Sequence, residues 1–289
     1  MLIDKRGMVT MKVQMNKRIG RLIFYFLIVV FAIIIVFPFL WQILTSFKPL
    51  SEISSMPPKW LPSELNLEYY VNVFTKRPFL NYLLNSFIVS GVTTLISVLI
   101  GASCAYALAR LRCRGKKIIL TVVLMVSMFP PIANLSPLFV FMKNMKLINT
   151  YLALIIPYTA MSLTLTVWLL TNFFKDIPKG LEEAAGMDGC GIYRCFATIV
   201  LPLGAPGIFA AALITFITAW NEYLYALTFM TKDQMRTVPV GIALFPGNYD
   251  LPWGDIAAAS VVVVVPLIIV VLIFQQKIIA GLTSGGVKE

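Results

Sequence analysis

The stretch Leu22-Ile-Phe-Tyr-Phe-Leu-Ile-Val-Val-Phe-Ala-Ile-Ile-Ile-Val-Phe-Pro-Phe-Leu-Trp-Gln-Ile-Leu44 contains no charged residue. A helix of this length would extend about 35 Å, and the hydrocarbon core of a bilayer is about 30 Å thick. A transmembrane strand would instead need alternating apolar and polar residues, and this stretch has no such alternation. The stretch therefore predicts a helix that spans a membrane.

Five more apolar blocks follow the first one along the chain. Of the 289 residues, 59% are hydrophobic and only 13% are charged, whereas soluble proteins have about 45–50% and about 25%. We therefore predict an all-α, polytopic membrane protein, with one transmembrane domain over residues 1–289. It consists of a tail at 1–21, a six-helix bundle at 22–279 and a tail at 280–289. The predicted helices cover residues 22–44, 83–109, 118–142, 151–174, 203–230 and 256–279.

The basic residues predict the orientation of these helices. Sixteen of the 24 Lys and Arg residues lie in the N-terminal tail, in the second and fourth loops, and at the C-terminal end from Lys277 onward. The positive-inside rule places these segments, and so both termini, in the cytoplasm. No small-residue cleavage site follows the first apolar run, so we expect a retained anchor and not a signal peptide. The net charge of +11 then reflects orientation and lipid contact, not nucleic-acid binding.

Several enzyme classes are excluded by residues that the chain lacks. It has no histidine, its four cysteines form no Cys-x-x-Cys pair, and it has no Gly-x-x-x-x-Gly-Lys-Ser/Thr loop. A Ser-His-Asp triad and a His-Glu-x-x-His metal site are therefore impossible, and nucleotide phosphates would have no loop to hold them. We expect no catalysis, no metal site and no cofactor bound by this chain.

The loop at residues 176–202 has the pattern of two short helices with a glycine corner. Pro178 suits the first position of a helix over Lys179–Met187, and a second segment covers Ile192–Ile199. Between them lie the glycines that permit a sharp turn, Gly189 and Gly191. Pro202 is expected to close the second segment. Such a projection suits close docking to a partner, although a solvated amphipathic loop is the alternative.

The spacing within this loop resembles a known signature. The order Glu183-Ala184-Ala185, three residues, Gly189, nine residues, Ile199-x-Leu201-Pro202 is similar to the EAA motif of permease subunits in bacterial ABC importers. In that family the loop forms a coupling helix that docks on a separate ATPase subunit. The resemblance implies an ATPase-coupling role for Glu183, Ala184, Ala185, Asp188, Gly189, Ile199, Leu201 and Pro202.

Other segments resemble the carbohydrate-uptake branch of these importers, and in particular the smaller permease of maltose/trehalose-type systems. They are Phe37-Pro38, Trp41, Ser46-Phe47-Lys48-Pro49, Asn85-Ser86, Trp220-Asn221-Glu222 and Gly281–Lys288. The resemblance implies an ATP-driven sugar importer in a bacterial or archaeal cell membrane. Its partners would be a second, homologous permease subunit, an ATPase dimer that binds ATP and Mg²⁺, and an extracytoplasmic solute-binding protein. The substrate would be a disaccharide or oligosaccharide.

Two more contact sets follow from this resemblance. The C-terminal tail would contact the ATPase through Thr283, Ser284, Gly285 and Gly286, whereas a frayed terminus is the alternative. The loop before the last helix would contact the binding protein through Gly247, Asn248, Tyr249, Asp250 and Trp253. For this loop an interfacial aromatic belt is the alternative.

Glu222 is an acid inside an apolar block. It lies about 19 residues into the fifth predicted helix, near 28 Å at 1.5 Å per residue, which places it toward the outer leaflet. An ionisable group there should face the bundle interior or a cavity. Asn221 and Glu222 are therefore possible pathway residues, although an interhelical hydrogen bond would equally explain the acid.

A rival function is ion-coupled secondary transport of a small solute. Such a transporter would carry acids within its helices and often an inverted repeat. The predicted helices contain few charges, and no repeat is evident. A spacing of small residues at Gly101, Ala105 and Ala109 predicts close helix packing within the chain.

Overall fold

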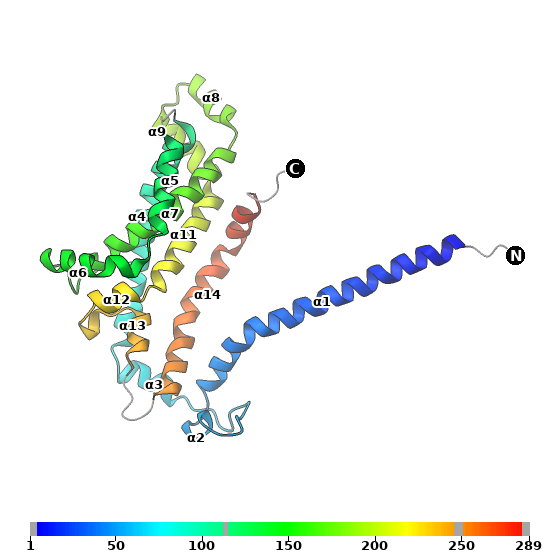
Figure 1. The fold of residues 1–289 in the computed structure, drawn as a ribbon, viewed down its shortest axis with the longest axis vertical. Coiled ribbons are helices and arrows are strands. Elements are labelled where there is room, and N and C mark those ends of the chain that lie inside the picture. Colours follow the sequence, from blue (N-terminus) through cyan, green and yellow to red (C-terminus); the bar gives the residue numbers. More distant parts are fainter. Residues whose placement is uncertain (1–4, 112–114, 246–250, 285–289) are drawn as a thin grey trace. The chain divides into compact units, whose positions relative to one another are not determined.

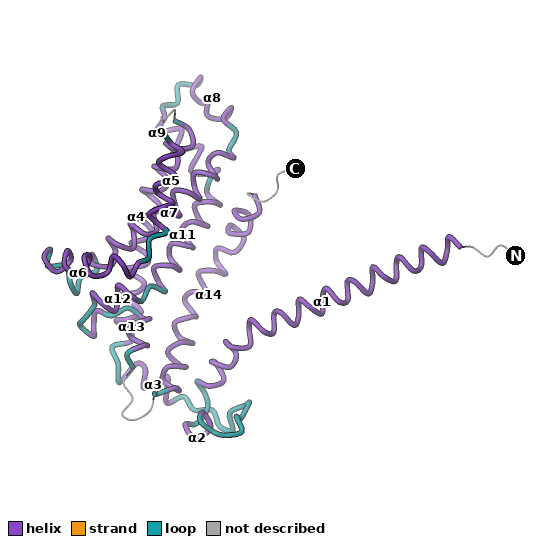
Figure 2. Tube along the Cα trace, in the orientation of Figure 1, coloured by secondary structure: helices purple, strands orange, loops and turns teal. Residues whose placement is uncertain are grey.

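The computed structural model describes residues 5–111, 115–245 and 251–284, which form helices and loops without any strand (Figure 2). The all-α prediction is thus confirmed for this part of the chain. Four helices there are long and apolar enough to cross a membrane, and a bent pair would make a fifth. The longer helices are α1 (Lys5–Thr45), α4 (Phe79–Arg110), α5 (Lys116–Ser127), α7 (Leu152–Asp176), α11 (Ala205–Trp220) and α14 (Trp253–Ser284).

Short helices connect these longer ones. They are α2 (Leu50–Ile53), α3 (Glu68–Thr75), η1 (Pro131–Asn134), α6 (Leu135–Asn144), α8 (Lys179–Met187), α9 (Ile192–Cys195), η2 (Phe196–Val200), α10 (Leu201–Leu203), α12 (Leu224–Phe229), η3 (Asp233–Met235) and α13 (Val238–Ala243). The chain divides into two compact units, one with residues up to 71 together with 252–261, the other with the remainder.

The larger unit is built around α4, α7 and α11, which lie side by side (Figure 1). Gly101 permits the closest approach, since a Cβ there would lie 2.6 Å from Cγ2 of Thr166 on α7. Ala105 and Ala109 are buried against Leu170 and its neighbours on α7. The predicted packing of small residues within the chain is therefore confirmed.

A second cluster of buried side chains holds the other end of this unit together. There α6, α12 and α13 lie near one another, away from α8 (Figure 1). Met142, Leu154, Tyr158, Phe229 and Val240 contribute buried side chains from four different helices, α6, α7, α12 and α13. This cluster fixes the short helices that follow the two breaks described next.

Two of the six predicted helices are interrupted in the structure. The third breaks after Ser127, where Pro130 and Pro131 lead into η1 and α6, because proline cannot donate a helical hydrogen bond. The fifth ends at Trp220 and resumes as α12. The single continuous helices expected at 118–142 and 203–230 were therefore wrong. The predicted boundaries of the other four are close, but α1 begins earlier and α14 continues to Ser284.

Candidate functional site

The loop at 176–202 folds largely as its sequence predicts. Helix α8 covers Lys179–Met187, and Pro178 is its N-cap residue instead of its first helical residue. Gly189 then adopts a left-handed φ of +80°. The N–H of Gly189 donates to the carbonyl of Gly186 (3.1 Å), and that of Cys190 donates to Ala185 (2.9 Å). This pair of bonds is the Schellman motif, which favours glycine at that position.

Glu182 ties α8 to the membrane bundle. Its carboxylate forms an ion pair with Nε of Arg110 at the end of α4, and both side chains are largely buried. The hydroxyl of Tyr106 donates to the same carboxylate (3.1 Å), and Nη2 of Arg110 donates to the carbonyl of Ile177 (2.7 Å). The first turn of α8 is therefore attached to α4 by a network of charge-assisted bonds.

The opposite side of the loop is open to solvent. Glu183, Ala184 and Asp188 are exposed. Two large apolar side chains beside them are also exposed, Met187 at 86% and Tyr193 at 88%. Exposed apolar side chains gathered with carboxylates are typical of surfaces that bind protein partners. We call these five residues the exposed coupling face.

The remaining motif residues lie where the loop joins the bundle. Ile199 and Leu201 are half-buried, whereas Pro202 is exposed. Pro202 lies within α10 and does not end the segment, contrary to the prediction. Gly204 follows, where a Cβ would lie 2.6 Å from the ring of Phe174. The chain bends by 76° between the Ile192–Leu203 segment and α11, so this junction redirects the loop into the bundle.

Glu222 lies in the break between α11 and α12, not within a continuous helix. Its carboxylate accepts hydrogen bonds from the backbone N–H groups of Tyr225 (2.9 Å) and Ala226 (3.2 Å), and from the hydroxyl of Tyr158 on α7. It thus caps the start of α12 and links that helix to α7. Asn221 is exposed, and its amide donates to the carbonyl of Ile217 (2.9 Å). The acid is therefore engaged by internal partners.

Most residues of the two other predicted contact sets lie outside the described residues. These are Gly247, Asn248, Tyr249 and Asp250 in the loop, and Gly285 and Gly286 in the tail. Trp253 opens α14 and is exposed, and Thr283 and Ser284 are its last residues. The roles predicted for both sets stay predictions.

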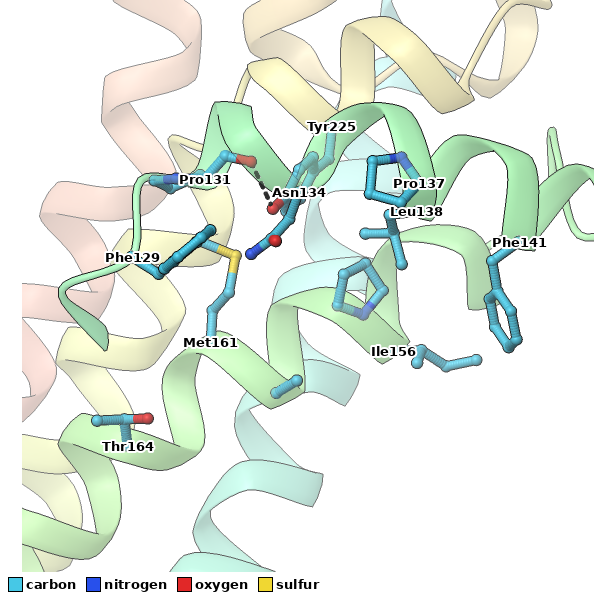
Figure 3. A pocket seen from close by; sticks show the side chains of 12 residues that line it. Phe129, Pro131, Asn134, Pro137, Leu138, Phe141, Ile156, Met161, Thr164 and Tyr225 are labelled. Atoms are coloured by element: carbon cyan, nitrogen blue, oxygen red, sulfur yellow. Dashed lines mark hydrogen bonds between the residues drawn. The ribbon is translucent and has the colours of Figure 1, made fainter. Parts of the chain in front are cut away.

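A cavity of about 550 Å³ lies beside α7 in the larger unit. Prolines and large apolar side chains from η1, α6 and α7 form most of its wall, together with Asn134, Thr164 and Tyr225 (Figure 3). The Tyr225 hydroxyl donates to the carbonyl of Pro131 (3.1 Å) and so connects α12 to the proline break. The sequence analysis did not predict this cavity.

Among the described residues, no group of three or more His, Cys, Asp or Glu side chains could hold a metal ion. Arg110, Tyr106 and Glu182 were not predicted as functional residues. The only sequence signal was their position, since Arg110 ends an apolar block and Glu182 precedes the motif glutamate.

Comparison with known proteins identifies a family and its sugar-transport members. The family described as "Binding-protein-dependent transport system inner membrane component" matches residues 97–283. The trehalose/maltose transport system permease protein MalG of Thermococcus litoralis is 42% identical over 268 residues, which are 90% of this chain and 94% of that protein. The sulfoquinovosyl glycerol transport system permease protein SmoH of Agrobacterium fabrum is 39% identical, over 87% and 88% respectively. The trehalose transport system permease protein SugB of Mycobacterium tuberculosis is 40% identical, over 87% and 92%.

Solved structures share the fold at lower identity. A chain of a bacterial ABC transporter involved in the import of the acidic polysaccharide alginate has a TM-score of 0.77 and 21% identity, covering 90% of this chain and 97% of that chain. A chain of the MetNI methionine ABC transporter has a TM-score of 0.54 and 18% identity, covering 70% and 95%. These matches show that the arrangement of helices is that of importer membrane subunits.

Proposed function

Because this chain belongs to the family of binding-protein-dependent transport system inner membrane components, we propose that it is one of two permease subunits in an ATP-driven sugar importer. It forms half of the translocation pathway and catalyses no reaction itself. ATP and Mg²⁺ bind to a separate ATPase dimer. The role of this chain is to convert closure of that dimer into alternating access of the pathway.

The observation that carries this proposal is the two-sided arrangement of α8. One acid, Glu182, is attached to the bundle through Arg110, and the next residue, Glu183, is exposed with Asp188, Met187 and Tyr193. A force applied to the exposed coupling face would therefore reach α4 through the buried ion pair. Coupling between two sites requires such an element, whose position both sites can bias.

The substrate class is supported by the relatives. Three of them, at 39–42% identity over most of this chain, have names that specify trehalose, maltose or a sulfoquinovosyl glycerol. Each of these is a glycoside. We infer that this chain transports a disaccharide, a short oligosaccharide or a related glycoside delivered by an extracytoplasmic binding protein.

The distribution of Lys and Arg supports an orientation with α8 in the cytoplasm. Both termini then lie on the same side as the ATPase, and the loop around Trp253 faces the binding protein. Asn221 and Glu222 lie at the helix break toward the outer side. Their contacts support a structural role at that break more than direct sugar binding.

The experiment is reconstitution of the chain with its second permease and ATPase, followed by measurement of sugar uptake and ATP hydrolysis. Glu183→Lys reverses a charge on the exposed coupling face, and Gly189→Pro cannot adopt a φ of +80°. We expect each variant to lower uptake by about five- to 150-fold, because a strained or mismatched contact costs about 1–3 kcal/mol. Exposed Lys143 on α6 provides a control, Lys143→Gln, with unchanged uptake.

Wild-type uptake and substrate-stimulated hydrolysis in both α8 variants would contradict the proposed docking. The same system tests the rival function. Uptake that an ionophore abolishes and vanadate does not would indicate ion-coupled transport instead.

A further inference from the structure

The smaller compact unit contains a polar cavity of about 310 Å³. A volume near 300 Å³ is at the lower end of the range for ligand pockets. Its wall comprises Trp41, Gln42, Thr45, Lys48, Glu52, Ile53, Pro58, Lys59, Trp253 and Ile256. The cavity thus combines two indoles with two ammonium groups and one carboxylate.

The cavity lies at the level where membrane helices end. Trp41, Gln42 and Thr45 form the last turn of α1, whose apolar span is Gly20–Thr45. Trp253 and Ile256 form the first turn of α14, whose apolar span starts at Trp253. Phospholipid headgroups lie directly beyond the ends of apolar spans, and Trp and Lys side chains gather there.

The charged side chain of Lys48 is buried without an acidic partner in the part of the chain that the structure describes. It is only 2% exposed, yet no carboxylate among the described residues lies within ion-pair distance of it. Its Nζ donates to the carbonyl of Lys59 (2.6 Å) and lies 4.0 Å from the centre of the Trp41 ring. A buried ammonium without a counter-charge is costly, and an anionic partner would offset that cost.

The one acid in the cavity is already neutralised. Glu52 accepts hydrogen bonds from Nζ of Lys59 (2.7 Å) and from the backbone N–H (3.2 Å) and hydroxyl of Ser63. These bonds lower the pKa of Glu52 to about 2, so the ion pair with Lys59 persists at neutral pH. Two ammonium groups against one carboxylate leave the cavity with a positive charge at Lys48.

The surrounding loop holds Lys48 in place. The hydroxyl of Ser46 bonds with that of Tyr70 (2.8 Å), and the N–H of Asn66 donates to the carbonyl of Phe47 (2.9 Å). Apolar side chains such as Phe37 and Leu40 are exposed along α1 below the cavity. Acyl chains could therefore lie along α1 while a headgroup occupies the cavity.

We propose that this cavity binds the phosphate of a membrane phospholipid, with Lys48 as the anion-binding group and Gln42 and Trp253 contacting the remainder of the headgroup. The proposal requires only that α1 spans the membrane. A soluble phosphate ester presents the same anionic oxygens, so the test must separate the two sources.

The test uses the complete transporter, purified with its partner permease and ATPase, delipidated, and titrated with phosphatidylglycerol while native mass spectrometry counts bound lipid. Lys48→Gln retains a donor for the Lys59 carbonyl but removes the charge. We expect it to bind the lipid about tenfold more weakly, since bonds to charged groups are the strong ones. Lys48→Arg should retain binding, and Lys143→Gln on α6 should leave it unchanged.

Equal lipid binding by the Lys48→Gln and Lys143→Gln transporters would overturn the proposal. Glycerol phosphate is titrated in parallel. Lys48-dependent binding of this soluble ester without binding of the lipid would contradict the assignment of the phosphate to a membrane phospholipid. Trp253→Ala serves as a second variant, because its indole is 54% exposed and its loss should not impair folding. It should weaken lipid binding several-fold, and unchanged binding would contradict the assignment of Trp253. ATP hydrolysis and partner co-purification, measured on the same samples, test the transport function separately.

Discussion

Two polar interruptions in this chain, the α8–α10 segment and the break between α11 and α12, use acidic residues in different ways. In the break, Glu222 has internal partners, since two backbone N–H groups and the Tyr158 hydroxyl donate hydrogen bonds to its carboxylate. In α8–α10, Glu182 likewise has internal partners, because it forms an ion pair with Arg110 and accepts a hydrogen bond from Tyr106. Glu183, the next residue, remains exposed. An acid with internal partners supports the fold, whereas the exposed Glu183 is accessible to a partner outside the chain.

The two segments also differ in whether they present an exposed surface in addition to their attachment to the bundle. Both segments are fixed to the bundle by a carboxylate that has internal partners, but only the α8–α10 segment adds an exposed surface with Met187 and Tyr193. An internally paired residue and an exposed residue therefore lie next to each other on one short helix.

The largest effect is expected from Arg110→Met. It leaves the Glu182 carboxylate largely buried without its partner, and breaking such a pair costs about 3–5 kcal/mol. Thermal unfolding of the purified transporter measures this loss. The double variant Arg110→Met, Glu182→Leu should recover much of it, and the matched surface change Glu183→Gln should alter stability by less than about 0.5 kcal/mol. Equal losses of thermal stability in Arg110→Met and Glu183→Gln would show that Arg110 does not anchor α8 to the bundle.

Substitution of Glu222 should have an intermediate effect. Glu222→Ala leaves the N–H groups of Tyr225 and Ala226 without an acceptor, which costs about 1–3 kcal/mol. Glu222→Gln keeps an acceptor oxygen and should retain nearly wild-type thermal stability and uptake. If Glu222→Gln abolished sugar uptake while stability stayed normal, the residue would belong to the pathway instead of the scaffold.

A smaller effect is expected at the glycine corner. Gly189→Ala must hold a side chain at φ +80°, which costs about 1–2 kcal/mol, and should reduce the number of sugars moved per ATP hydrolysed. Gly191→Ala is the matched control, because its φ is −70° and nothing lies within 4 Å of the added Cβ. Identical coupling ratios in the two variants would show that the turn geometry is not required.

The smallest effect concerns pH and Glu52. Its pKa is lowered from 4.5 to about 2 by hydrogen bonds from Lys59 and Ser63. A carboxylate with a lowered folded-state pKa stabilises the protein above its unfolded pKa, and that stabilisation fades as pH falls through the folded value. The difference in thermal midpoint between wild type and Glu52→Gln should thus be constant above about pH 5 and shrink toward pH 2. A difference that disappeared already at pH 5 would contradict the network.

The fold class and the loop architecture could be predicted because they depend on local patterns. Apolar length determines membrane spans, and Gly189 determines the corner after α8. The breaks at Pro130–Pro131 and Trp220 were missed, since a bundle can hold an apolar block either as one helix or as two. The inward direction of Glu182 could not be predicted from sequence, because it depends on Arg110, which is 72 residues distant along the chain.

We propose that the exposed coupling face docks on a nucleotide-hydrolysing subunit. The most direct measurement places a photo-reactive amino acid at Met187 and, as a control, at Leu165, which is exposed on α7. Irradiation of native membranes should crosslink position 187, but not position 165, to an ATPase subunit identified by mass spectrometry. Failure of position 187 to capture any ATPase in membranes that support uptake would contradict docking of the exposed coupling face on an ATPase subunit.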